Sequence, residues 1–281
     1  MPGIRFLLKV SRPRFWIYVF GPFIVGLAGA ATDRADLLRP DIALFTIYFL
    51  LPANLLIYGV NDLFDFETDR RNPKKSKYEL LVRPESYRYL IAAILLTNFP
   101  LLIAALIFAP AVIASLAGFL FFSIFYSAPP IRAKAKPMID SLFNILYLFP
   151  GIIGYQLIAG TLPPLPVIVA GALWTTAMHA YSAVPDIDAD RESGLLTIAT
   201  FLGGRGTLIL CLLLYLASAV LTFNYLGAIS FVLAAVYALM IAASFAAINA
   251  DRVFSVYRLF PIVNTACGFL LFWYAVYLNF R

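Results

Sequence analysis

The sequence is poor in charge. Charged residues make up 13% of its 281 positions, whereas hydrophobic residues make up 62%. Soluble globular domains carry charge at about a quarter of their positions. A water-soluble fold of this composition would have to expose more apolar surface than it could bury. The scarcity of charge therefore excludes an ordinary soluble domain and predicts an integral membrane protein.

Cysteine and linker sequence are also scarce. The two cysteines, Cys211 and Cys267, lie inside apolar runs, which excludes a disulfide framework and favours a packing role. No Ser/Gly-rich linker divides the chain, so a single transmembrane domain is expected over 1–281. The basic N-terminal segment is not followed by a signal-peptide cleavage pattern, so the first apolar span is expected to stay in the membrane.

The sequence contains several long apolar runs that are almost free of charged residues. Crossing the bilayer core takes about 20 apolar residues. Candidate spans lie at 13–31, 41–60, 87–108, 111–128, 138–159, 165–183, 206–223, 227–248 and 258–279. The third and fourth run together at Pro110, which favours a tight turn but leaves a count of eight open. The expected fold is an all-α membrane bundle of about nine transmembrane helices.

The few charges are distributed unevenly between the two sides of such a bundle. Of the 21 Lys and Arg residues, all but Arg34, Arg39 and Arg281 fall on the side of the N-terminus. The positive-inside rule makes that side cytoplasmic and places the C-terminus outside. The net charge of +6 mostly reports this bias, and no aromatic-basic surface pattern indicates nucleic-acid binding. All but three of the 15 Asp and Glu residues fall on the cytoplasmic side as well.

The first acidic segment ends the second span. On a continuing helix, Asn61, Asp65 and Asp69 recur every four residues, and Asp62 joins their face. Stacked carboxylates repel one another, and a divalent cation between them relieves the repulsion. Mg²⁺ suits such a site because it prefers oxygen ligands and leaves positions for substrate phosphates. These four residues are candidate metal ligands; Asp65 and Asp69 are also candidate catalytic residues, and Asn61 a candidate substrate-binding residue.

The second acidic segment ends the sixth span. Asp186 and Asp190 are one helical turn apart and share a face, so both are candidate metal-binding and catalytic residues. Asp188 points elsewhere and ranks lower, and Gly194 is expected to end the helix. Each segment follows the second span of a group of four, which suggests two four-helix pseudo-repeats plus one helix. Two such half-sites could hold two Mg²⁺ ions with a diphosphate between them; solvated loop acids are the alternative.

Basic, aromatic and amide side chains accompany the acids. Arg70 and Lys74 follow the first segment, while Tyr126, Arg132 and Lys134 follow the fourth span. Sidedness alone explains most of the basic residues, but Arg and Lys also stabilise a departing pyrophosphate. Polar side chains inside spans are costly unless they face a cavity or a partner. On that ground the candidate substrate-binding residues are Arg70, Lys74, Arg132, Lys134, Asn54, Asn144 and His179, with Tyr126 as a candidate catalytic residue. His179 could accept a proton late in a reaction, although a hydrogen-bonded structural role is the stronger alternative.

Taken together, these residues resemble the UbiA-type intramembrane prenyltransferases. The matching segments are the Asn-Asp-x-x-Asp-x-x-x-Asp of 61–69, the Tyr-Ser with basic residues of 126–136 and the Asp-x-x-x-Asp-x-x-x-Gly-x-x-Thr of 186–197. Within that family, the local sequences of 11–16, 72–75 and 178–186 are most similar to the carotenoid-elongating branch. Many quinone-pathway members have an Arg-Pro-Leu-type segment where this chain has 72–75. The resemblance implies a helical bundle around a central cavity, with Mg²⁺ and diphosphate held by Asn61, Asp65, Asp69, Asp186 and Asp190.

The expected reaction moves an isoprenoid group from a prenyl diphosphate to a lipophilic acceptor. Mg²⁺ would weaken the allylic C–O bond, and a dry aromatic cavity would shelter the cation until the acceptor captures it. The resemblance implies lycopene as one acceptor, while an aromatic or quinone precursor, a tetrapyrrole or a lipid glycerol stays open. A cation transporter is the alternative from another class. Transporters place their acids near the bilayer midplane, whereas these acids are expected at the rim beside Arg and Lys.

Overall fold

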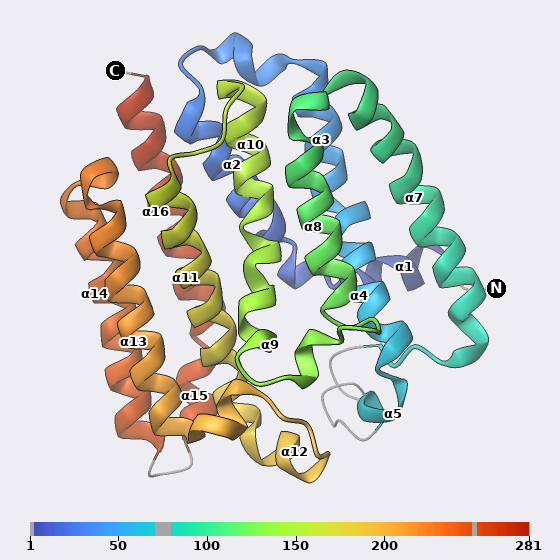
Figure 1. The fold of residues 1–281 in the computed structure, drawn as a ribbon, viewed down its shortest axis with the longest axis vertical. Coiled ribbons are helices and arrows are strands. Elements are labelled where there is room, and N and C mark those ends of the chain that lie inside the picture. Colours follow the sequence, from blue (N-terminus) through green and yellow to red (C-terminus); the bar gives the residue numbers. More distant parts are fainter. Residues whose placement is uncertain (1–2, 71–79, 249–251, 281) are drawn as a thin grey trace. The chain divides into compact units, whose positions relative to one another are not determined.

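The computed structural model describes residues 3–70, 80–248 and 252–280, and every regular element in those ranges is a helix (Figure 1). The chain divides into two compact units. Unit 1 comprises Met1–Arg132, Phe149–Leu162 and Leu271–Arg281, and unit 2 comprises Ala133–Leu148 and Pro163–Leu270. The fifth expected span is therefore shared between the units. This grouping differs from two successive groups of four spans, because the chain changes unit within that span.

Unit 1 contains the first aspartate segment. Its helices are α1 (Ile4–Val10), α2 (Ile17–Ala30), α3 (Pro40–Leu50), α4 (Pro52–Phe64), α5 (Phe66–Asp69), α7 (Tyr87–Phe108), α8 (Ile113–Phe125) and α10 (Phe149–Ala159). Its core is aromatic: the ring of Phe49 lies 5.0 Å from that of Phe23 and 5.7 Å from that of Phe119. Helix α4 crosses this core with every side chain from Pro52 to Val60 buried, and Asp62 in its last turn is buried as well.

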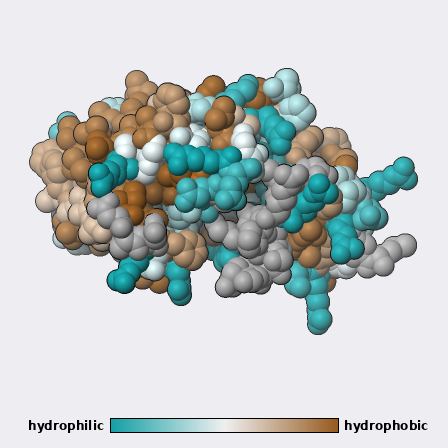
Figure 2. Space-filling model, turned by 90° about the horizontal axis from the view of Figure 1, so that it is seen from below, coloured by the Kyte–Doolittle hydropathy of each residue, from teal (hydrophilic) through white to brown (hydrophobic). Residues whose placement is uncertain are grey.

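Unit 2 contains the second aspartate segment. Its helices are α9 (Ile139–Leu142), α11 (Leu165–Ala183), α12 (Ile187–Glu192), α13 (Ile198–Leu226), α14 (Ala228–Ile248) and α15 (Val253–Tyr257). Helix α16 (Phe260–Asn279) begins in unit 2 and ends in unit 1. Stacked Tyr215 and Tyr237 rings, 4.3 Å apart, join α13 to α14, and Tyr181 bonds Ser244 across α11 and α14. Helix α12 lies at the lower end of α11 in Figure 1, and the view from that side shows hydrophilic residues among hydrophobic ones (Figure 2).

The apolar spans confirm the membrane prediction. Within the described residues, eight helical stretches are long and apolar enough to cross a bilayer, and Pro110–Phe125 is a shorter apolar one. These nine stretches match the nine candidate spans in order, and the short one explains why the count was ambiguous. Pro110 opens a turn of 3-10 helix after α7, as its position predicted. The structure therefore has the expected all-α membrane architecture.

Two helices of unit 1, α2 and α10, approach each other through glycines. A Cβ atom on Gly26 would lie 2.0 Å from the carbonyl oxygen of Gly151, and one on Gly154 would lie 2.4 Å from the carbonyl oxygen of Phe23. Both neighbours are backbone atoms, which cannot rotate away. Small residues at helix crossings let backbones pack closely in a membrane, where no hydrophobic force drives helices together. These glycines fix the α2–α10 spacing.

Candidate metal-diphosphate site

The first aspartate segment is not one continuous helix, which corrects the prediction from its spacing. Helix α4 ends at Phe64, and Asp65 has φ −114° and ψ 4° before α5 begins. Asp65 remains in register because its carbonyl oxygen accepts from the Asp69 amide at 2.8 Å. The Asp65 carboxylate also accepts a hydrogen bond from the Asn61 amide one turn earlier, a spacing that keeps the two side chains on one face across the break. The break leaves Asp65 and Asp69 still one turn apart.

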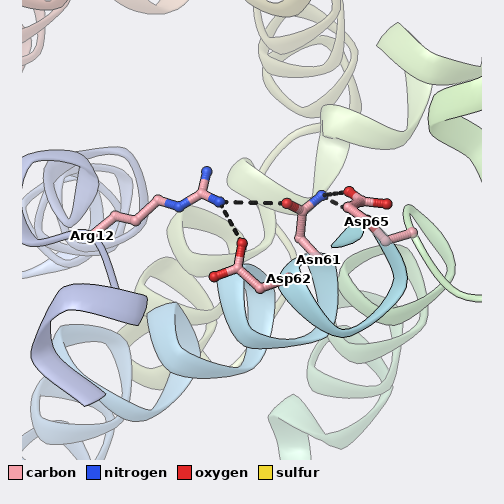
Figure 3. A network of polar contacts seen from close by, with 5 residues as sticks. Arg12, Asn61, Asp62 and Asp65 are labelled. Carbon is pink, nitrogen blue, oxygen red and sulfur yellow. Dashed lines mark hydrogen bonds and ion pairs between the residues drawn. The ribbon is translucent and has the colours of Figure 1, made fainter. Parts of the chain in front are cut away.

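The side chains of Asn61 and Asp65 meet at this break. The Asn61 amide nitrogen donates to Oδ2 of Asp65 at 2.7 Å and to Oγ of Ser127 at 3.0 Å (Figure 3). Asp65 is only 4% exposed, whereas Asp69 is half-buried. Ser127 is the buried neighbour of Tyr126 in the segment after α8. The structure thus ties the first aspartate segment to the Tyr-Ser segment, 66 residues further along the chain.

Asp62 forms an ion pair with Arg12. Its Oδ1 accepts from Nη2 of Arg12 at 2.8 Å, and the Asp62 side chain is 2% exposed. The same Nη2 lies 3.5 Å from Oδ1 of Asn61. Arg12 was not among the candidate site residues, because 50 positions separate it from Asp62 and no periodicity links them. In the sequence, Arg12 was marked only as part of the segment 11–16, which resembles the carotenoid-elongating branch.

The second aspartate segment follows a change of helix type. A 3-10 turn, Val184–Asp186, separates α11 from α12, and both Asp186 and Asp190 are half-buried. Asp188 is 95% exposed and lies 3.9 Å from Arg191, which fits its lower rank. Gly194 has φ +70° just after α12, which confirms that it ends the helix. Thr197, which caps α13, also directs its hydroxyl to Oδ2 of Asp190 at 3.4 Å.

Asp140 is a buried acid that the sequence analysis passed over. It has no exposed surface, and its Oδ2 accepts from the backbone amide of Ile198 at 2.9 Å in the first turn of α13. Thr197, the N-cap, immediately precedes Ile198, so Asp140 bonds to the backbone next to the residue that contacts Asp190. Two predicted site residues, Asn144 and His179, form hydrogen bonds with Asp140 and with its neighbour Ser141. The Asn144 amide donates to the Asp140 carbonyl at 2.9 Å, and Nδ1 of His179 lies 3.1 Å from Oγ of Ser141.

The remaining candidates occupy less defined positions. Asn54 is fully buried, and its amide donates to the carbonyls of Phe49 and Leu50, where α3 gives way to α4. That contact is structural, so substrate binding by Asn54 stays a prediction. Tyr126 and Lys134 are half-buried, while Arg70 and Arg132 are exposed. Lys74 lies outside the described residues.

The chemistry of these side chains fits Mg²⁺. In the described ranges no three His, Cys, Asp or Glu side chains gather into one cluster that could hold a metal ion. Mg²⁺ does not require such a cage, since one or two carboxylates with water and substrate phosphates commonly complete its six positions. Asn61, Asp65 and Asp69 offer oxygen ligands from unit 1, and Asp186 and Asp190 offer them from unit 2.

Fold and site together define an all-helical membrane protein with two separate acidic segments at helix ends. A profile of the UbiA prenyltransferase family matches residues 19–273. The chain therefore belongs to the UbiA prenyltransferase family, and it is an integral membrane prenyltransferase.

Named relatives and solved structures agree with this assignment. The chain is 41% identical to a lycopene elongase/hydratase of Haloarcula japonica over 270 residues, covering 94% of this chain and 89% of that one. It is 39% identical to a lycopene elongase/hydratase of Corynebacterium glutamicum over 235 residues, covering 79% and 77%. A UbiA homolog from Archaeoglobus fulgidus, bound to GPP and Mg²⁺, shares the fold with a TM-score of 0.69 at 20% identity, covering 95% of this chain and 99% of that one. An apo UbiA homolog from Aeropyrum pernix gives 0.61 at 23%, covering 92% and 98%.

Proposed function

We propose that this enzyme prenylates a carotenoid, with lycopene as the acceptor. The allylic C–O bond of a prenyl diphosphate breaks and pyrophosphate leaves with the bonding electrons. A terminal alkene of the acceptor then forms the new C–C bond, and the product either loses a proton or takes up water. The observation that carries the acceptor is the identity of about 40% with relatives named lycopene elongase/hydratase, over most of the chain. The small charge content suits a lipophilic acceptor that arrives through the bilayer.

In this proposal the two acidic segments serve one reaction. Asn61, Asp65 and Asp69 with Asp186 and Asp190 would hold Mg²⁺, which supplies the positive charge that binds diphosphate and favours its departure. The protein's own contribution is to hold these oxygens in place. Asn61, which also donates to Ser127, orients Asp65, and Thr197 orients Asp190. Placing charge before the reaction begins avoids the reorganisation that water would need.

Basic and aromatic side chains have supporting roles. Arg70, Arg132 and Lys134, with Lys74, are proposed to stabilise the departing pyrophosphate, because their charges complement it. Tyr126 follows directly on α8 and precedes Ser127, so its ring is proposed to face the allylic cation near the metal ligands. His179, beside Ser141, is proposed to accept the proton released when the cation loses a proton or is captured by water. The cytoplasm is proposed to contain the N-terminus and both acidic segments, because of the uneven distribution of Lys and Arg.

The acceptor can be identified by label transfer. Purified enzyme in lipid, supplied with Mg²⁺ and labelled dimethylallyl diphosphate, is given lycopene or 4-hydroxybenzoate in separate reactions. We expect label to enter lycopene, because the chain's named relatives act on that carotenoid. Label that enters 4-hydroxybenzoate alone would keep the prenyltransferase and discard the carotenoid acceptor. If neither accepts label, the same pair of acceptors is tested with geranyl and longer donors, and failure with all of them would overturn the carotenoid proposal.

A further inference from the structure

Arg12 stands at a strained point of the backbone. It joins α1 to a 3-10 turn, Pro13–Phe15, with φ 50° and ψ 70°, a left-handed conformation that is uncommon outside glycine, asparagine and aspartate. Pro13 restricts the preceding residue further. Such a conformation persists only where other contacts stabilise it, and strained residues are concentrated at functional sites. The contacts of the Arg12 side chain supply that compensation.

The guanidinium of Arg12 is held on two sides by α4. Nη2 donates to Oδ1 of Asp62 at 2.8 Å, and Cζ lies 4.8 Å from the centre of the Tyr58 ring. Tyr58 and Asp62 are one turn apart, so both contacts come from the same face of the helix. The Arg12 side chain is 14% exposed and that of Asp62 is 2% exposed. Removing one member of such a pair is expected to be harmful, because it leaves a buried charge without its counter-charge.

The ion pair reaches the candidate metal ligands through Asn61. The Oδ1 atom of Asn61 faces Nη2 of Arg12 at 3.5 Å, which leaves the amide nitrogen to donate to Asp65 and Ser127 (Figure 3). The bonds to Asp65 and Ser127 fix the orientation of the Asn61 amide, and the longer contact with Arg12 favours the same orientation. It also neutralises Asp62, which would otherwise add a third like charge next to Asp65 and Asp69.

We propose that Arg12 is a positioning residue that presets the first aspartate segment for metal binding, with Asp62 as its structural counter-charge. This inference rests on the proposed function of the segment. It gives Asp62 a task other than metal ligation and leaves Asp65 and Asp69 as the carboxylates that face the cation. It also explains how a segment at the start of the chain contributes to a site formed by α4 and α5.

A charge-matched pair of variants tests the proposal. Arg12→Gln removes the positive charge that faces Asp62, whereas Arg12→Gln combined with Asp62→Asn makes both positions neutral and able to hydrogen-bond. Arg14→Gln is the matched control, because Arg14 is in the same segment and lies 4.5 Å from the Phe15 ring centre. The readout is the binding of Mn²⁺ in the presence of inorganic pyrophosphate, measured from the free Mn²⁺ signal in electron paramagnetic resonance. This measurement needs no turnover, and the Tm of each variant is recorded beside it.

The expected result is a rise of about 10-fold in the Mn²⁺ dissociation constant for Arg12→Gln, since changes around metal ligands typically weaken metal affinity about 10–100-fold. The double variant should return to within about threefold of the wild type, and Arg14→Gln should match it. Equal weakening in the single and double variants would overturn the proposal, because it would mean that Arg12 contacts pyrophosphate directly or that Asp62 is itself a metal ligand. A lower Tm with unchanged Mn²⁺ binding would also overturn it, as a purely structural role. Failure of the wild type itself to bind Mn²⁺ with pyrophosphate would instead count against the proposed function.

Discussion

Asp65→Asn and Asp190→Asn are each expected to lower turnover by about 10²–10³-fold, the loss typical when one preorganised charge-stabilising group is removed. Asparagine keeps the size of each side chain but removes the negative charge that binds Mg²⁺. Asp65 is buried against Asn61, so no water can substitute fully for the lost carboxylate oxygen. The measurement is the initial rate of label transfer from the prenyl diphosphate, with protein folding checked by Tm.

Asp188→Asn is the control for this pair of variants. Asp188 lies in the same short helix as Asp190 but is 95% exposed beside Arg191, so its replacement should change the rate by less than about twofold, as expected for an exposed ion pair. Near-normal turnover in both Asp65→Asn and Asp190→Asn would disprove a mechanism that needs both segments. A loss in only one of them would confine the catalytic site to a single segment.

Gly26→Ala is expected to destabilise the protein by about 3 kcal/mol, at the upper end of the range for overpacking. The new Cβ would lie 2.0 Å from the Gly151 carbonyl oxygen, so α2 and α10 would have to separate. Gly154→Ala, with its Cβ 2.4 Å from the Phe23 carbonyl oxygen, should have a similar effect. The measurement is denaturant or thermal unfolding of the purified protein in one detergent.

Gly29→Ala provides the comparison within α2. Its Cβ would lie 3.9 Å from a ring carbon of Tyr155, an ordinary contact, and alanine favours the helix. We expect its stability to equal or slightly exceed that of the wild type. If Gly26→Ala and Gly29→Ala unfold at the same temperature or denaturant concentration, the close crossing of α2 and α10 does not limit stability.

Much of the fold follows from periodicity that is local in the sequence. Apolar runs of bilayer length have to be helical, because a backbone in lipid must satisfy its own hydrogen bonds. The positions of both acidic segments followed from the ends of those runs, and Gly194 ended its helix as predicted. The pairing of Arg12 with Asp62 is different, because it depends on how α1 lies against α4. No spacing rule connects residues 50 positions apart.

Local departures from ideal helices also escaped the sequence analysis. Asp65 was expected inside a continuing helix, but its backbone leaves the helical conformation and α4 ends at Phe64. Asn54 and Asn144 were named as substrate-binding candidates because polar groups in spans need a cavity or a partner. The structure shows amide donors bonded to backbone carbonyls near helix breaks, which is another way to satisfy them. The hydrogen-bond partners of these buried amides therefore could not be predicted from the sequence.

The most direct test of the account is the amount of pyrophosphate released for each prenyl group transferred, with and without Mg²⁺. The enzyme in liposomes is given labelled prenyl diphosphate and lycopene, and product and pyrophosphate are measured in the same sample. The account predicts one pyrophosphate per transferred group, and loss of both when a chelator removes the metal. Unchanged transfer in the presence of chelator would contradict the metal site. Cation movement across the liposome membrane without pyrophosphate release would contradict the enzyme and favour a transporter.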